Sequence, residues 1–88
     1  MKFGLLIPLA APYGTSRFVE KLGRLAEDHG FDSLWLGEHV VVPAQWESSY
    51  PLDEAGRMPS AVQLGELDAY TTLAYLAAIT KRIRLGAC

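Results

Sequence analysis

The sequence predicts an α/β fold in which parallel strands alternate with helices. Three short apolar runs, residues 3–7, 33–37 and 83–87, have the length and composition of strands that are buried on both faces. Helical periodicity occupies residues 16–29 and 69–80, between the successive runs. The order is therefore β-α-β-loop-α-β, and two such crossovers imply parallel strands with right-handed connections.

The composition is that of a small soluble globular protein. The 88 residues are 50% apolar and 20% charged, with a formal net charge of -2. This charge offers no basic surface for nucleic acid and no polybasic segment for a membrane, so we expect neither partner. No run approaches the roughly 20 apolar residues of a membrane span, and we find no export signal. A single cysteine fits a reducing compartment, so we expect a cytoplasmic protein.

The first strand and the first helix have clear boundary signals. Pro8 ends the first apolar run, and Thr15 or Ser16 can N-cap the helix that follows. Gly30 stands where the glycine after a helix C-terminus belongs. The residues at helical spacing that we expect on the buried face are Phe18, Leu22, Leu25, Ala26 and His29.

The second strand is followed by a long segment without periodicity, residues 40–65. Segments of more than about 15 residues without helix or strand are usually lids, binding loops or disordered stretches in compact domains, and the aromatic residues of this segment argue against plain disorder. Trp46 and Tyr50 lie in this segment. Whether they stack on a ligand or fasten the loop to the rim of the sheet is left open.

The second helix and the third strand repeat the pattern of the first unit. Asp68 is a suitable N-cap for a helix over residues 69–80. The third strand, residues 83–87, follows almost directly, and Cys88 comes next. The residues that we expect in the buried stripe of this helix are Tyr70, Leu73, Ala74, Ala77 and Ala78.

Ionisable residues stand at the end of the second strand. Glu38 and His39 follow a buried run, where charge is costly unless the strand end opens onto a site. The carboxyl ends of parallel strands meet at one edge, and α/β proteins form their sites there. We therefore expect His39 to act as an acid, a base or a hydrogen-bond donor toward a ligand; the alternative is a histidine that only caps the strand. Strand alternation directs Glu38 away from His39, which favours a structural role.

Other chemistries have weaker support. His29 is expected to be a packed or capping histidine, and a metal site of His29, His39 and Cys88 has no ligand spacing in its favour, so no metal is expected. Cys88 has no base near it in sequence, so we expect an inert buried thiol.

A doubly wound nucleotide-binding fold would carry G-x-G-x-x-G after the first strand, and residues 8–12 do not. The (β/α)8 TIM barrel is therefore favoured. Because such a barrel takes about 250 residues, we expect residues 1–88 to be its N-terminal third.

Three blocks of the sequence resemble the start of luciferase-like monooxygenase proteins. They are MKFGLLIP (residues 1–8), AEDHGFDSLWLGEHVVVP (26–43) and LDAYTTLAYLAAITKRIRLG (67–86). The resemblance is closest to the subgroup that uses the deazaflavin coenzyme F420. It implies a (β/α)8 barrel with F420 at its carboxyl edge and hydride transfer between F420 and a small organic substrate. An FMN-dependent monooxygenase that uses O2 is the alternative.

The resemblance also implies roles for single residues. His39 matches the histidine that ends the second strand beside the reactive ring, which makes it the catalytic candidate. His39, Pro8 and Cys88 are the cofactor-binding candidates, and Trp46 and Tyr50 the substrate or lid candidates. The family often has a non-prolyl cis peptide at or just beyond the position of Cys88, and commonly Gly-Thr or Gly-Ser where this chain has Ala-Cys. We expect residues 1–88 alone to be inactive.

A hypothesis of a different class is a non-catalytic module that associates through an open sheet face. An exposed apolar patch of that kind requires a partner. Assembly as a homo-oligomer is compatible with either class, and the sequence does not decide it. The strand residues expected on the open face are Leu5, Ile7, Trp35 and Ile83.

Overall fold

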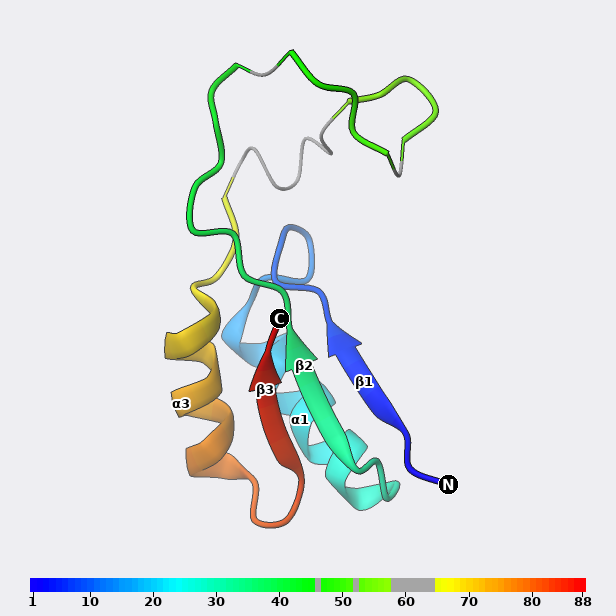
Figure 1. Cartoon of the computed structure of the whole chain (residues 1–88). Helices are drawn as coiled ribbons and strands as arrows, with labels where there is room; N and C mark the ends of the chain where they lie inside the picture. Colours follow the sequence, from blue (N-terminus) through cyan, green and yellow to red (C-terminus); the bar gives the residue numbers. More distant parts are fainter. Residues whose placement is uncertain (46, 52, 58–64) are drawn as a thin grey trace.

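The computed structural model describes residues 1–45, 47–51, 53–57 and 65–88. In chain order the elements are β1 (Gly4–Ile7), α1 (Ser16–Asp28), β2 (Ser33–Leu36), α3 (Ala69–Ile79) and β3 (Arg84–Ala87) (Figure 1). The strands form one sheet in the order β1-β2-β3, and both pairs are parallel. The predicted α/β fold with parallel strands is thus confirmed, and each element ends within one residue of its predicted bounds.

Side-chain caps determine where both helices begin. Thr15 Oγ1 accepts a hydrogen bond from the Phe18 N–H (3.2 Å) at the start of α1. Asp68 Oδ1 accepts one from the Thr71 N–H (2.7 Å) at the start of α3. The side chain and backbone of Thr71 both hydrogen-bond this carboxylate, and they lower the pKa of Asp68 below its ordinary value. Each cap satisfies a backbone donor that the first helical turn leaves free.

Gly30 ends α1 with a Schellman motif. Its φ of 79° is a conformation that side chains disfavour. The Gly30 N–H donates to the Glu27 carbonyl (3.2 Å), and the Phe31 N–H donates to the Ala26 carbonyl (3.0 Å). His29 occupies the C-cap position and is exposed, so it is not packed in the core.

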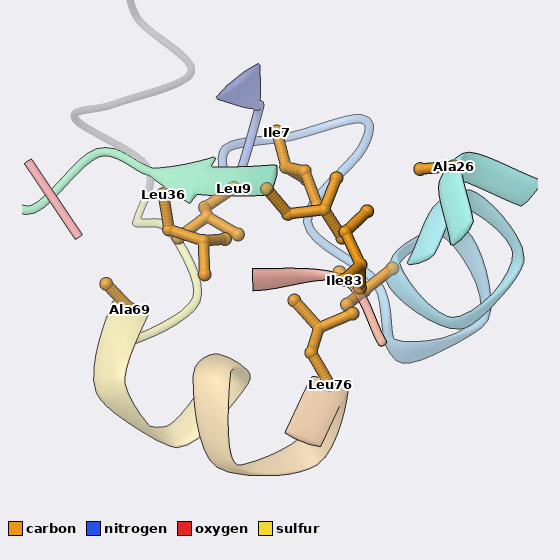
Figure 2. Packing of buried hydrophobic residues seen from close by; sticks show 9 residues of the cluster. Ile7, Leu9, Ala26, Leu36, Ala69, Leu76 and Ile83 are labelled. Carbon is orange, nitrogen blue, oxygen red and sulfur yellow. The ribbon is translucent and has the colours of Figure 1, made fainter. Parts of the chain in front are cut away.

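Both helices pack on one face of the sheet, and the core lies between them and the strands (Figures 1 and 2). The two helices approach closely at Gly23, because a Cβ at this position would lie 2.6 Å from Leu76 Cδ2. The buried apolar residues that form the core are Ile7, Leu9, Val19, Ala26, Leu34, Leu36, Ala69, Leu76 and Ile83.

The predicted buried faces of the helices are partly wrong. On α1, Leu25 and His29 are exposed, whereas Val19 and Gly23 are buried. On α3 the buried positions are Ala69, Thr72 and Leu76. Helix α3 has no charged residue, so its apolar pattern does not distinguish one face from another. The α3 residues that were expected to be buried and are exposed are Tyr70, Ala74, Ala77 and Ala78.

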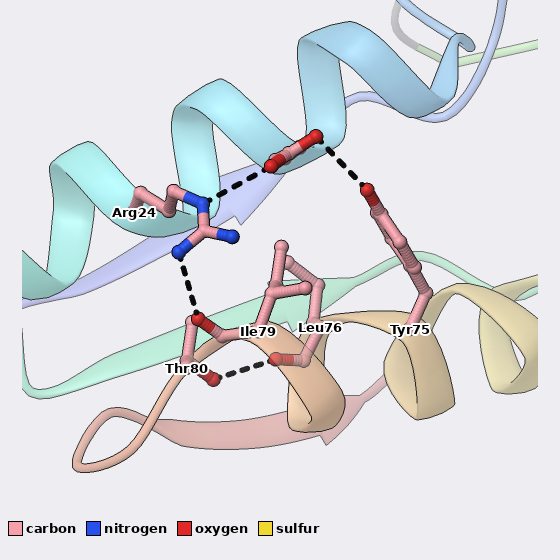
Figure 3. A network of polar contacts seen from close by, with 6 residues as sticks. Arg24, Tyr75, Leu76, Ile79 and Thr80 are labelled. Carbon is pink, nitrogen blue, oxygen red and sulfur yellow. Dashed lines mark hydrogen bonds and ion pairs between the residues drawn. The ribbon is translucent and has the colours of Figure 1, made fainter.

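A polar network joins the two helices beside the core (Figure 3). Glu20 accepts hydrogen bonds from Arg24 Nε (3.1 Å) on its own helix and from the Tyr75 hydroxyl (3.1 Å) on α3. Arg24 also reaches the Ile79 carbonyl (3.4 Å). Desolvation and the bond to Glu20 raise the pKa of Tyr75.

Glu27 anchors the turn from α3 to β3. Its Oε1 accepts hydrogen bonds from the backbone N–H groups of Lys81 (2.8 Å), Arg82 (2.5 Å) and Ile83 (3.0 Å). These bonds, that of Arg82 first, lower the pKa of Glu27 from 4.5 to about 2. The carboxylate therefore substitutes for the backbone acceptors that this tight connection lacks.

Within the described part of the chain, no element covers the opposite face of the sheet (Figure 1). Leu6 (63% exposed) and Trp35 (44%) lie there. The prediction that placed Ile7 and Ile83 on this face is wrong, because strand alternation turns them into the core, and Leu5 also packs against the core.

The Trp35 indole lies against two glycines of the neighbouring strands, Gly4 of β1 and Gly86 of β3. Its Nε1 donates to Ser33 Oγ (3.0 Å). A Cβ at Gly86 would lie 2.6 Å from the ring, and one at Gly4 would lie 3.1 Å from it. The two glycines thus provide the space that the indole occupies across the sheet. No helix in the described segments has the length and hydrophobicity needed to cross a bilayer.

Candidate functional site

The carboxyl ends of all three strands lie at one edge of the sheet. Ile7, Leu36 and Ala87 are paired in register. The ladder continues one step further, because the Cys88 N–H donates to the Leu36 carbonyl (3.0 Å) and the Glu38 N–H donates to the Cys88 carbonyl (3.0 Å). The structure therefore brings the ends that carry Pro8, His39 and Cys88 to one edge, and their roles remain predictions.

His39 is held by a carboxylate from the far end of the long loop. Its Nδ1 lies 2.7 Å from Glu66 Oε1. The His39 side chain is 42% exposed and that of Glu66 is 19% exposed. The imidazole thus has one nitrogen bound to Glu66 and part of its surface open at the edge.

The backbone of Glu66 is tied to the connection between β1 and α1. Glu66 forms an isolated antiparallel bridge with Ala10, and the Leu67 N–H donates to the Leu9 carbonyl (3.1 Å). Asp68, the N-cap of α3, follows directly. The ends of β1 and β2 and the start of α3 therefore converge on the His39–Glu66 pair.

Glu66 was not among the site residues predicted from the sequence. It lies 27 residues from His39, in a segment without periodicity, so no local pattern connects the two. Topology provides the available signal, because a crossover helix between parallel strands begins at the carboxyl edge. Residues just before α3 could therefore have been expected near His39.

A shallow hollow of about 270 Å³ lies beside the pair, between residues 37–40 and 66–69. Three carboxylates, of Glu38, Glu66 and Asp68, contribute to its lining, and these eight residues include no lysine or arginine. Glu38 Oε2 is buried and has no hydrogen-bond partner among the described residues. A buried acceptor in this state carries the desolvation cost of an unmade hydrogen bond.

The other site candidates occupy different surroundings. Cys88 is exposed, with its Sγ 3.7 Å from the Leu36 carbonyl, so the prediction of a buried thiol is wrong. Pro8 is exposed directly after β1. Tyr50 is partly buried in a turn of the long loop, where its N–H donates to the Gly56 carbonyl (2.9 Å). Trp46 lies outside the described residues. Where the structure describes the chain, no three His, Cys, Asp or Glu side chains group as metal ligands do.

Comparison with known proteins identifies the family. The sequence matches the luciferase-like monooxygenase family over residues 1–88. The chain belongs to this family. Uncharacterized protein Rv0953c of Mycobacterium tuberculosis and uncharacterized protein Mb0978c of Mycobacterium bovis are each 34% identical to it over 63 residues. The match covers 72% of this chain but only 22% of each relative. No solved structure matches the chain significantly.

The fold of this luciferase-like chain agrees with part of a (β/α)8 barrel. In such a barrel, helices form the outer layer and the inner face of the sheet is turned toward the barrel interior. The open face that carries Leu6 and Trp35 corresponds to the inner face, and the edge that carries His39 corresponds to the carboxyl rim.

Proposed function

We propose that this chain contributes the His39 rim of an oxidoreductase that uses coenzyme F420 and transfers hydride between it and a small organic substrate. The observation that supports this most directly is the position of His39, at the carboxyl edge of a parallel sheet and beside an open hollow. Active sites of barrel enzymes lie at this edge. Family membership supports flavin-type chemistry, and the three sequence blocks favour the F420 subgroup.

The residues at the rim suit the ring end of a deazaflavin or a flavin rather than its phosphate-bearing tail. Carboxylates repel phosphate groups, and three of them lie around the hollow. Carboxylates of this lining can accept a hydrogen bond from a ring N–H, and the His39 imidazole can donate to or accept from polar ring atoms. His39, Pro8 and Cys88 would thus hold the ring, while cationic groups for the phosphates would come from elsewhere.

Protein groups at the rim would have a limited set of tasks. F420 when bound supplies or accepts the hydride, as cofactors carry the redox chemistry in such enzymes. His39 Nε2, the nitrogen not bound to Glu66, would hydrogen-bond the substrate and hold or move its proton. The segment over residues 40–65, with Trp46 and Tyr50, would cover the substrate and limit the access of water.

An FMN-dependent monooxygenase that uses O2 is the second candidate, because the family description names monooxygenases. The flavin ring of FMN would contact His39 and the carboxylates in the same way as the ring of F420. The two candidate functions differ in their cofactor, so separate titrations of the protein with F420 and with FMN distinguish them.

The test uses the full-length protein and two histidine variants. Binding of F420 and of FMN is measured by fluorescence titration, and turnover is followed by the change in cofactor absorbance. We expect F420 to bind and His39→Ala to lose turnover by about 100-fold or more, the scale of positioned acid–base catalysis. His29→Ala is the matched control, because His29 is exposed at the C-cap of α1. If neither cofactor binds, or if both variants keep full turnover, the proposed function fails.

A further inference from the structure

We propose that Glu66 is a positioning residue that fixes the ring orientation and the tautomer of His39. The inference rests on the proposed function, since it takes His39 as the group that faces the ligand. The first test of the inference needs neither cofactor nor turnover, so the inference and the proposed function can fail separately.

The contact defines which imidazole nitrogen carries the proton. Nδ1 of His39 and Oε1 of Glu66 are 2.7 Å apart, the distance of a strong hydrogen bond to a carboxylate. An ionised carboxylate only accepts, so Nδ1 must be the protonated nitrogen. In the neutral imidazole, Nε2 is then left unprotonated, with a lone pair that can take a proton or a hydrogen bond.

The carboxylate is held more firmly than the imidazole it contacts. Glu66 is tied through its backbone to Ala10, and its neighbour Leu67 is tied to Leu9. Asp68, two residues further on, caps α3. The side chain of Glu66 is also less exposed than that of His39, 19% against 42%. Because His39 lies after the end of β2 and before the long loop, its ring depends on Glu66 for a fixed direction.

A carboxylate that directs an imidazole in this way affects chemistry without contacting the substrate. When the carboxylate is removed, the imidazole ring can turn and the proton can move from Nδ1 to Nε2. The unprotonated Nε2, a hydrogen-bond acceptor, would then become an N–H donor. Glu66 would act on the substrate only through His39, so its removal would change the proton at Nε2 and leave the other residues of the lining in place. The expected signature is a fall in kcat with little change in KM.

The first experiment reads the tautomer directly. Full-length protein is labelled with 15N in its imidazole rings, and two-bond 1H–15N spectra are recorded at pH of about 8.5, where an ordinary imidazole is neutral. The His39 signals are assigned by their loss in His39→Gln. We expect Nδ1 to be protonated and Nε2 unprotonated in the wild type, with an increased Nε2–H population in Glu66→Ala. Glu66→Gln should keep the wild-type tautomer, because its amide oxygen can still accept from Nδ1–H.

Glu54→Gln is the matched control, because Glu54 is exposed in the long loop. It should leave the His39 signals unchanged. A wild-type His39 protonated at Nε2, or a tautomer that Glu66→Ala does not change, would overturn the inference. Circular dichroism of each variant establishes that it is folded, and Glu66→Gln provides the test if Glu66→Ala is not.

The second experiment uses turnover. Glu66→Ala should lower kcat by about 10- to 100-fold, by analogy with carboxylates that orient metal-binding histidines, with KM changed less than threefold. Glu66→Gln should recover most of this loss. Equal kcat values in the wild type and in Glu66→Ala would overturn the positioning role. Failure of the protein to bind either cofactor would remove the proposed function and leave the tautomer result intact.

Discussion

Gly23 of α1 lies directly against Leu76 of α3, and the effects of substitutions at these two positions on stability should be strongly coupled. A Cβ at Gly23 would lie 2.6 Å from Leu76 Cδ2, against about 3.5–4.0 Å for an ordinary carbon contact, so Leu76 would have to retreat by about 1 Å. Leu76 is fully buried and has little room to move. Overpacking of this kind costs about 1–3 kcal/mol, whereas the exchange of glycine for alanine in a helix gains about 1 kcal/mol. Gly23→Ala should therefore destabilise the protein by about 0–2 kcal/mol.

In the Leu76→Ala background the same change should stabilise the protein. Leu76→Ala alone costs about 2–5 kcal/mol, and it removes the group with which the new methyl collides. Gly23→Ala then gains about 1 kcal/mol of helix propensity and fills part of the cavity. The coupling energy should be about 1–3 kcal/mol.

Urea unfolding of the wild type, the two single variants and the double variant measures this coupling. Lys21→Gly is the control, because Lys21 is exposed on α1 and its substitution should cost about 1 kcal/mol in both backgrounds. If Gly23→Ala has the same effect with and without Leu76, the packing explanation is refuted. The result bears on function, since α3 begins at the edge where Glu66 meets His39.

Two further predictions concern single contacts. Because hydrogen bonding lowers the pKa of Glu27 from 4.5 to about 2, its contribution to stability should be complete above pH 4.5 and be lost as the pH falls toward 2. The midpoint temperature of thermal unfolding should therefore fall less with decreasing pH for Glu27→Gln than for the wild type. An equal fall in both proteins would contradict the role given to the Glu27 carboxylate. Gly86→Ala should displace the Trp35 indole, because the ring lies 2.6 Å from the position of the new Cβ, and should change the tryptophan emission spectrum. Gly37→Ala is its control, since a Cβ there meets nothing within 4 Å, and equal spectra for the two variants would contradict the packing described for Trp35.

Features that depend on residues close together in the sequence were the most predictable. The apolar runs of β1, β2 and β3, the caps at Asp68 and Gly30 and the parallel order all follow from local composition and chain connectivity. These features were also sufficient to place Pro8, His39 and Cys88 at one edge.

Features that depend on distant contacts were not predictable in the same way. Helix α3 is apolar on all sides, so only its packing against α1 determines that Leu76 is buried and Tyr70 is exposed. The partner of His39 lies 27 residues away, beyond a loop without periodicity. Glu27 bonds a turn 54 residues later in the chain, which no local pattern indicates.

The most direct test of the central claim is to observe the His39 ring while cofactor is added to the full-length protein. His39 and His29 are both labelled, and their imidazole 15N signals are followed during separate titrations with F420 and with FMN. The account predicts that the His39 signals shift and saturate with F420, or with FMN if the second candidate function holds, while the His29 signals do not move. His39 signals that remain unchanged at saturating concentrations of both cofactors would contradict it.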